Sequence, residues 1–64
     1  MPKNMTKYDI YREAIETAKD ELERAERNLM LVDPELTVWA AHEVIAKQEK
    51  LNILIQLAKK ELTA

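Results

Sequence analysis

Apolar side chains recur along the first half of the chain at intervals that alternate between three and four residues. The series is Tyr8, Tyr11, Ile15, Ala18, Leu22, Ala25, Leu29 and Val32. This spacing places one narrow apolar seam along an α-helix whose other sides are polar. Thr6 precedes the series as an N-cap, Asp9 follows three residues later as in a capping box, and Met5 and Ile10 have the spacing of a hydrophobic staple. The pattern predicts a helix over about residues 6–32.

Asp33-Pro34 interrupts this pattern. Proline disfavours a helical conformation in the residue before it and has no N–H for a helical hydrogen bond, so the first helix should end there. Proline suits the first position of a new helix, with Asp33 as its N-cap and Glu35 near the positive end of its dipole. The sequence therefore predicts a corner at 33–34 and a second helix over about 34–62, antiparallel to the first because the link is so short.

The two predicted helices can be aligned by pairing residues whose numbers sum to 69. In most of these pairs a large side chain meets an alanine, which lets two helices approach closely without voids. Leu22 falls opposite Lys47, whose stem would lie along the seam with its ammonium in water. The predicted core of the hairpin is Tyr11, Ile15, Ala18, Leu22, Ala25, Leu29, Ala40, Val44, Leu51, Leu54 and Ala58.

The second helix carries apolar residues on two sides. At about 100° per residue, one set faces the first helix, and a second set lies on nearly the opposite side. This second set is Trp39, Ala46, Ile53 and Leu57, flanked by Val38 and Ile45. Burying one large apolar side chain contributes about 1.5–3 kcal/mol, whereas a domain of this size has a total stability of about 5 kcal/mol or less. We therefore expect the second set to contact another protein surface.

These patterns predict an all-α fold, an antiparallel two-helix hairpin that dimerises into a four-helix bundle. In the expected homodimer the second helices meet about a two-fold axis and the charged first helices lie outside. Alternatively, the same residues dock onto a different protein, such as a regulator, as a helix lying in a groove. In both cases the predicted function is that of a non-enzymatic protein–protein interaction module.

Length and composition limit the number of domains and the kinds of partner. The 64 residues allow one domain, and we expect residues 1–5 to be flexible. So small a fold usually needs additional stabilisation. Cysteine is absent, which excludes disulfides and leaves self-association. The net charge of −2 argues against nucleic acid as a partner. No stretch approaches the roughly 18 apolar residues of a membrane span, and the first residues lack the apolar run of a signal peptide. We expect a cytoplasmic protein with no membrane partner.

Candidate chemistry is sparse. Glu35, His42 and Glu49 recur every seventh residue, but seven residues advance a helix by about 10.5 Å, too far for one ion to bridge within a chain. A set from two chains is the alternative, and a polar edge in contact with water is the simpler interpretation. We therefore expect no metal and no cofactor. Serine and cysteine are absent, which excludes them as catalytic nucleophiles. Glycine is also absent, which excludes a glycine-rich phosphate-binding loop. Carboxylate-based catalysis stays open only in principle, because the sequence indicates no apolar pocket that would perturb a pKa.

Residues 15–62 resemble the YaaL-like family of small bacterial helical proteins. The positions that carry the resemblance are Ile15-Glu16, Ala18-Lys19, Glu21, Ala25, Asp33-Pro34-Glu35-Leu36, Trp39-Ala40, Leu54 and Ala58-Lys59. The match runs without gaps over about three quarters of the chain. The resemblance implies a small cytosolic helical protein without an assigned activity.

Residues 48–55, QEKLNILI, also resemble the Ser-Gln-Glu-Leu-Asp-x-Leu-Ile motif of two-helix aspartyl-phosphate phosphatases of sporulation signalling. Gln48 stands in place of the motif serine, and Asn52 replaces the motif aspartate. An amide can orient a water molecule but cannot act as a base at neutral pH. This resemblance gives the alternative function, a phosphatase of a phosphorylated response regulator in which Gln48 and Asn52 are the catalytic residues.

Overall fold

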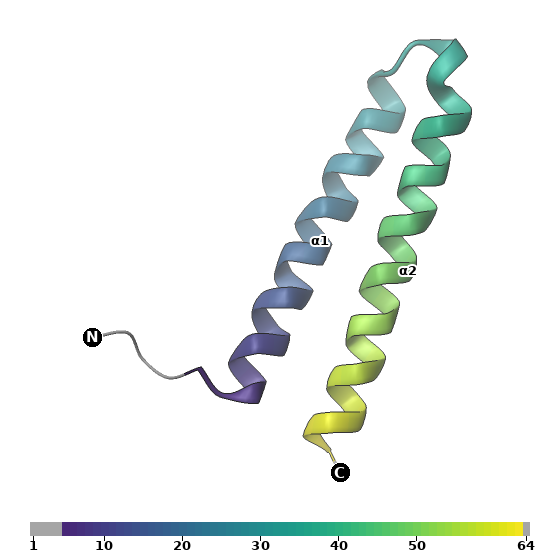
Figure 1. The fold of residues 1–64 in the computed structure, drawn as a ribbon. Helices are drawn as coiled ribbons and strands as arrows, with labels where there is room; N and C mark the ends of the chain where they lie inside the picture. Colours follow the sequence, from purple (N-terminus) through teal and green to yellow (C-terminus); the bar gives the residue numbers. More distant parts are fainter. Residues whose placement is uncertain (1–4, 64) are drawn as a thin grey trace.

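The computed structural model describes residues 5–63, which form two antiparallel helices joined by a short corner. Helix α1 spans Lys7–Leu31, a 3-10 turn η1 spans Pro34–Leu36, and helix α2 spans Thr37–Leu62. Figure 1 shows the two helices side by side, with the start of α1 and the end of α2 at the same end of the molecule. The predicted all-α hairpin is confirmed. Most of the stretch expected to be flexible, 1–5, lies outside the described residues.

The start of α1 has the predicted capping box. The Thr6 hydroxyl accepts a hydrogen bond from the Asp9 backbone N–H at 3.1 Å, and the Asp9 carboxylate accepts one from the Thr6 N–H at 3.2 Å. The reciprocal bonds satisfy backbone donors that the first turn of a helix otherwise leaves unpaired. The side chains of Met5 and Ile10 line one groove, which agrees with the staple spacing.

The corner is longer than predicted. Helix α1 ends at Leu31, and Pro34–Leu36 forms a 3-10 turn in which the Leu36 N–H donates to the Asp33 carbonyl at 2.8 Å. Asp33 takes the predicted N-cap position with Pro34 after it, but it precedes the 3-10 turn and not the α-helix, whose N-cap is Leu36. Asp33 is extended (φ −61°, ψ 147°), as a residue before proline prefers, and its carboxylate makes no capping hydrogen bond. The tighter 3-10 turn, common at helix starts, completes the change of direction before the α-helix begins at Thr37.

The core between the helices consists mainly of alanine. The buried residues are Ala18, Ala25, Ala40, Leu51 and Ala58. The other predicted core residues, Tyr11, Ile15, Leu22, Leu29, Val44 and Leu54, are half-buried. Alanine side chains permit the short end of the range of interhelical distances, about 8 Å. They also bury little apolar surface, because each contributes a single methyl group, worth about 0.8 kcal/mol.

Three ion pairs between the helices agree with the predicted register. Lys7 Nζ lies 3.3 Å from Glu61 Oε2, while Glu21 Oε1 lies 2.9 Å from Lys50 Nζ and 3.9 Å from Lys47 Nζ. All three pairs lie within two positions of the register in which residue numbers sum to 69. Lys47 is half-buried and its ammonium reaches Glu21 at the edge of the seam, as expected for a lysine whose stem lies along apolar surface.

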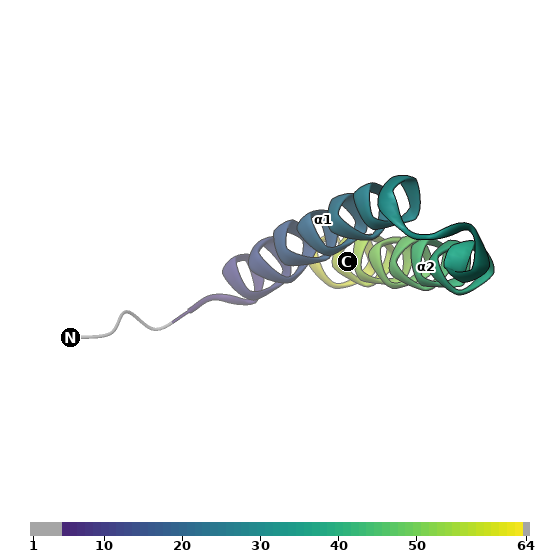
Figure 2. The same ribbon diagram turned by 90° about the horizontal axis from the view of Figure 1, so that it is seen from above.

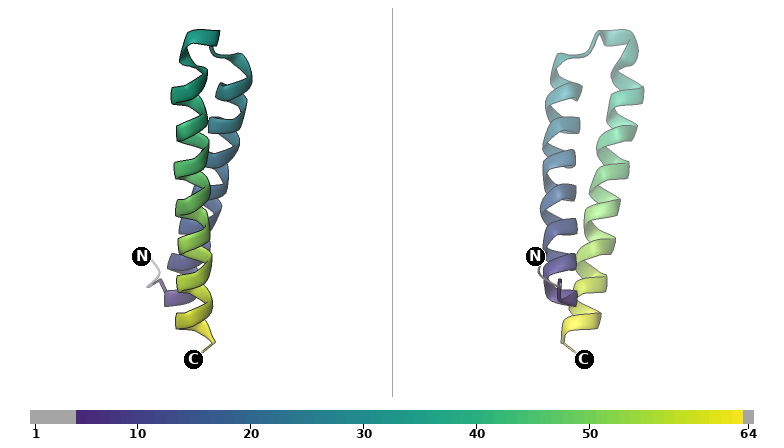
Figure 3. Two further views of the ribbon diagram at one scale, coloured as in Figure 1. Left: turned by 90° about the vertical axis from the view of Figure 1, so that its right-hand side faces the viewer. Right: turned by 60° about the vertical axis from the view of Figure 1, so that its left-hand side comes forward.

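The hairpin is a single layer of helices. Its Cα atoms extend 11 Å along the thinnest principal axis. Figures 2 and 3 show α1 and α2 beside each other, with no further helix or strand of the described residues over either one. Domains usually bury their apolar faces between two or more layers of secondary structure. A helix with apolar residues on two sides is therefore covered on only one of them in this hairpin.

The alanine seam yields a first prediction. Replacing Ala18 by leucine inserts three carbon atoms where the helices are in contact, and overpacking of this kind costs about 1–3 kcal/mol. We expect Ala18→Leu to lower the midpoint of urea unfolding, followed by circular dichroism. The matched control is Asp20→Leu at an exposed position of the same helix, which should not lower the midpoint. Equal stability of Ala18→Leu and the unmodified chain would contradict the close approach of the helices.

Candidate interaction surface

Helix α2 presents a row of exposed apolar side chains that α1 does not cover. We define the outer face as Trp39, Ala46, Ile53 and Leu57. Trp39 is 55% exposed, Ile53 57% and Leu57 42%, and Ala46 is also exposed. The flanking Val38 and Ile45 are exposed as well. The structure therefore places all six predicted interface residues on the surface of the hairpin, and the Trp39 side chain is not inside it.

Lys50 marks the side of the hairpin on which the outer face lies. Lys50 precedes Leu57 by seven residues, so the two project in nearly the same direction from α2. The Lys50 ammonium donates to the Glu21 carboxylate of α1 at 2.9 Å. The outer face therefore adjoins the side of α1 that carries Glu21.

A shallow groove of about 400 Å³ lies on this same side of the hairpin. Its lining residues are Met5, Ile10, Glu13, Ala14, Thr17 and Lys50. Ile10 is more than half exposed and Met5 nearly so. Apolar side chains of α1 are therefore exposed on the same side of the hairpin as Lys50 of α2.

Sequence reasoning missed the contribution of α1 to this surface. Ile10 was interpreted only as part of a staple, although Ile10, Ala14 and Thr17 follow one another at intervals of four and three residues. That spacing places them on one stripe beside the main seam. The signal was present, but the stripe is short and ends in a threonine.

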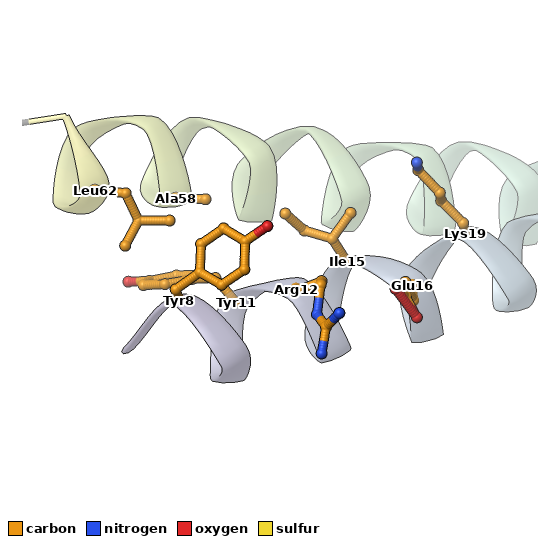
Figure 4. Close-up of a pocket in the computed structure, with 8 residues that line it drawn as sticks. All are labelled: Tyr8, Tyr11, Arg12, Ile15, Glu16, Lys19, Ala58 and Leu62. Carbon is orange, nitrogen blue, oxygen red and sulfur yellow. The ribbon is translucent and has the colours of Figure 1, made fainter. Parts of the chain in front are cut away.

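A second hollow, of about 260 Å³, lies at the open end of the hairpin on the other side of the seam. Its lining residues are Tyr8, Tyr11, Arg12, Ile15, Glu16, Lys19, Ala58 and Leu62. Figure 4 shows the two tyrosine rings between α1 and the last turns of α2, and the Arg12 guanidinium turned away from α2. The hollow therefore lies along the edge of the seam between α1 and α2, at the end of the hairpin opposite the corner.

The residues of the phosphatase alternative form one exposed pair. Gln48 Nε2 donates to Asn52 Oδ1 at 3.2 Å, one helical turn away. Neither residue lines either of the two hollows. The pair offers amide donors and acceptors to water, without a carboxylate of its own.

Among residues 5–63, no group of three or more histidine, cysteine, aspartate or glutamate side chains is placed to hold a metal ion. His42 is exposed on α2. Neither helix of the described part of the chain is long and apolar enough to cross a membrane.

Comparisons with protein-family models, curated proteins and solved structures found no match for this chain. The resemblances to the YaaL-like family and to the sporulation phosphatases therefore stay predictions.

Glu21 is the titratable group whose environment bears on this surface. The hydrogen bond from Lys50 holds the pKa of the Glu21 carboxyl below its ordinary value of 4.5, and the positive charges of Lys50, Lys47 and Arg24 act in the same direction against partial desolvation. A carboxyl whose pKa is lower in the folded than in the unfolded chain stabilises the fold above the unfolded pKa. This stabilisation is lost as the pH falls through the folded pKa.

A second prediction follows from this pKa. We expect the unmodified chain to lose stability as the pH falls below about 4.5, and Glu21→Gln to lose less over the same interval because one linked proton is removed. Urea unfolding at a series of pH values measures both slopes. Lys50→Gln removes the donor and should flatten the slope in the same way. Identical slopes for all three chains would show that the ion pair does not contribute to stability in solution.

Proposed function

We propose that this chain is a non-enzymatic protein–protein interaction module that self-associates through the outer face of α2. Two hairpins would form a four-helix bundle with the α2 helices in contact at its centre. The observation that carries the proposal is the exposure of Trp39, Ile53 and Leu57 on the side of α2 that faces away from the seam.

The size of the hairpin core supports the proposal. The seam buries four alanines and one leucine, whereas the outer face exposes three larger apolar side chains whose full burial would contribute about 1.5–3 kcal/mol each. The larger seam residues are themselves only half-buried, so the isolated hairpin leaves much of its apolar surface in contact with water. A second hairpin would supply the second layer that most domains have.

The distribution of charge supports the same arrangement. On α2, the outer face is bordered by Glu43 and Lys50 on one side and by His42 and Glu49 on the other. Apolar residues within a polar border are typical of the centre and rim of a protein interface. On α1, exposed charged residues occupy the side away from the seam, such as the Glu23–Arg27 ion pair at 3.5 Å. This side suits contact with water on the outside of a bundle.

The third prediction tests self-association. We expect light scattering to give the unmodified chain a mass of twice its 7.5 kDa. Trp39→Gln/Ile53→Gln should weaken the dimer at least about 100-fold, because two large apolar side chains are lost from each copy. Glutamine is a good helix former, so the hairpin should keep its helix content, which circular dichroism measures.

The matched control is Met30→Gln/Leu31→Gln. These two side chains are 83% and 82% exposed, but they lie at the end of α1 and outside the outer face. The control should stay dimeric. A chain that is monomeric without any substitution, and equally helical, would contradict self-association; docking onto a different protein would then be the remaining use of the outer face.

A second candidate function is the aspartyl-phosphate phosphatase. The observation in its favour is the exposed Gln48–Asn52 pair on the helix that resembles the phosphatase motif. An exposed amide can orient a water molecule for attack on a phosphoryl group, although it cannot accept its proton. This function would therefore rely on orientation and on groups of the phosphorylated partner.

The fourth prediction separates the two candidates. If the protein acts by contact alone, incubation with a phosphorylated receiver domain should leave the lifetime of the aspartyl phosphate unchanged. A shortened lifetime that Gln48→Ala/Asn52→Ala restores would support the phosphatase instead. The lifetime is measured by the loss of radiolabelled phosphate from the receiver.

A further inference from the structure

We propose an orientation for this dimer, an inference that rests on the proposed self-association: the two α2 helices cross antiparallel, with the two-fold axis beside Ala46. In this arrangement Trp39 of each protomer packs against the partner's Ile53. The inference adds the orientation and register of the helices to the surface identified above.

The apolar residues of the outer face are distributed symmetrically about Ala46. Trp39 lies seven residues before it and Ile53 seven residues after it. Further out, Leu36 lies ten residues before and Leu57 eleven after, and both are more than 40% exposed. A two-fold axis perpendicular to the helices relates a position before the axis to the equivalent position after it in the partner. Trp39 therefore meets the partner's Ile53; Leu36 belongs to η1, so α-helical spacing does not determine its neighbour.

Side-chain size also suits a crossing at Ala46. With only a methyl group on the axis, the two helices can approach to about 8 Å at that point. One Trp–Ile pair then fills each side of the crossing, so that the two sides have equal volume. A parallel pair would instead place both tryptophans at one level and both isoleucines at another, which gives the two ends unequal spacing.

The charged residues beside the outer face are compatible with the same orientation. Glu43 and Lys50 are seven residues apart and border the outer face on one side, on opposite sides of Ala46 along the helix. An antiparallel pair brings this border against the same border of the partner, so Glu43 lies beside the partner's Lys50, and the contact occurs twice. Lys50 can keep its bond to Glu21, because an ammonium has three donors.

The border on the other side of the outer face, His42 and Glu49, also pairs with its equivalent in the partner. His42 lies four residues before Ala46 and Glu49 three residues after it. The antiparallel crossing therefore places His42 beside the partner's Glu49. A parallel pair would instead bring unlike borders together, with Lys50 beside the partner's Glu49. The choice of the antiparallel orientation therefore depends on the positions of Trp39, Ala46 and Ile53.

The fifth prediction tests this orientation by distance measurement between spin labels. The sequence has no cysteine, so a single introduced cysteine is labelled alone. Lys59→Cys and Gln48→Cys both place the label at an exposed position of α2 outside the outer face. In the antiparallel dimer, the two labels at position 59 are about 40 Å apart along the helix axes, and those at position 48 about 6 Å. Both positions lie on the side of α2 away from Ala46, so the separation across the bundle adds to both distances. Pulsed electron paramagnetic resonance should therefore give a much longer distance for Lys59→Cys.

Each outcome has a separate meaning. Similar distances for both variants would show a parallel dimer and overturn the inference, while leaving self-association intact. The absence of dipolar coupling in both variants, together with a monomeric mass, would overturn the proposed self-association itself. Circular dichroism of the labelled chains checks that each retains its helix content.

Discussion

The close approach of α1 and α2 along a seam of alanines determines the other properties of this hairpin. The buried residues are four alanines and Leu51, and each half-buried large side chain lies at the edge of the seam. Small side chains let the helices pack closely, but they remove little apolar surface from water. The hairpin therefore has well-matched helices and a small hydrophobic core.

The outer face is a consequence of the same arrangement. One neighbouring helix covers only one side of α2, and the hairpin is a single layer, 11 Å in its thinnest Cα extent. Trp39, Ile53 and Leu57 then remain in water unless a second molecule covers them. The groove lined by Met5 and Ile10 enlarges the apolar surface on the same side. Self-association would complete a core that the single chain builds only in part.

Most of the fold was predictable because it follows from local chemistry and helical periodicity. The unbroken alternation of three and four residues gave α1, the Thr6–Asp9 capping box gave its start, and the pairing of large residues with alanine gave the register. The corner was predicted less well. Proline marks where a helix ends, but the sequence pattern does not distinguish an α-helical first turn from the 3-10 turn that η1 forms.

Features that depend on the exact rotation of one helix against the other could not be predicted. The Glu21–Lys50 ion pair joins residues whose separation follows from that rotation, and no local pattern marks it. The groove at Ile10 depends on which side of α1 adjoins the outer face. For the candidate site, the sequence predicted which α2 residues are exposed, because their angle around the helix determines their exposure. It did not predict which residues of α1 lie beside them.

In the proposed dimer, a second chain covers the outer face in solution. Trp39 is the only tryptophan, so its fluorescence reports directly on that face. We predict that the Trp39 emission maximum shifts to shorter wavelength as the chain concentration rises, because the indole leaves water when two hairpins associate. Emission typical of a water-exposed indole at every concentration, from a chain that circular dichroism shows to be helical, would contradict the account.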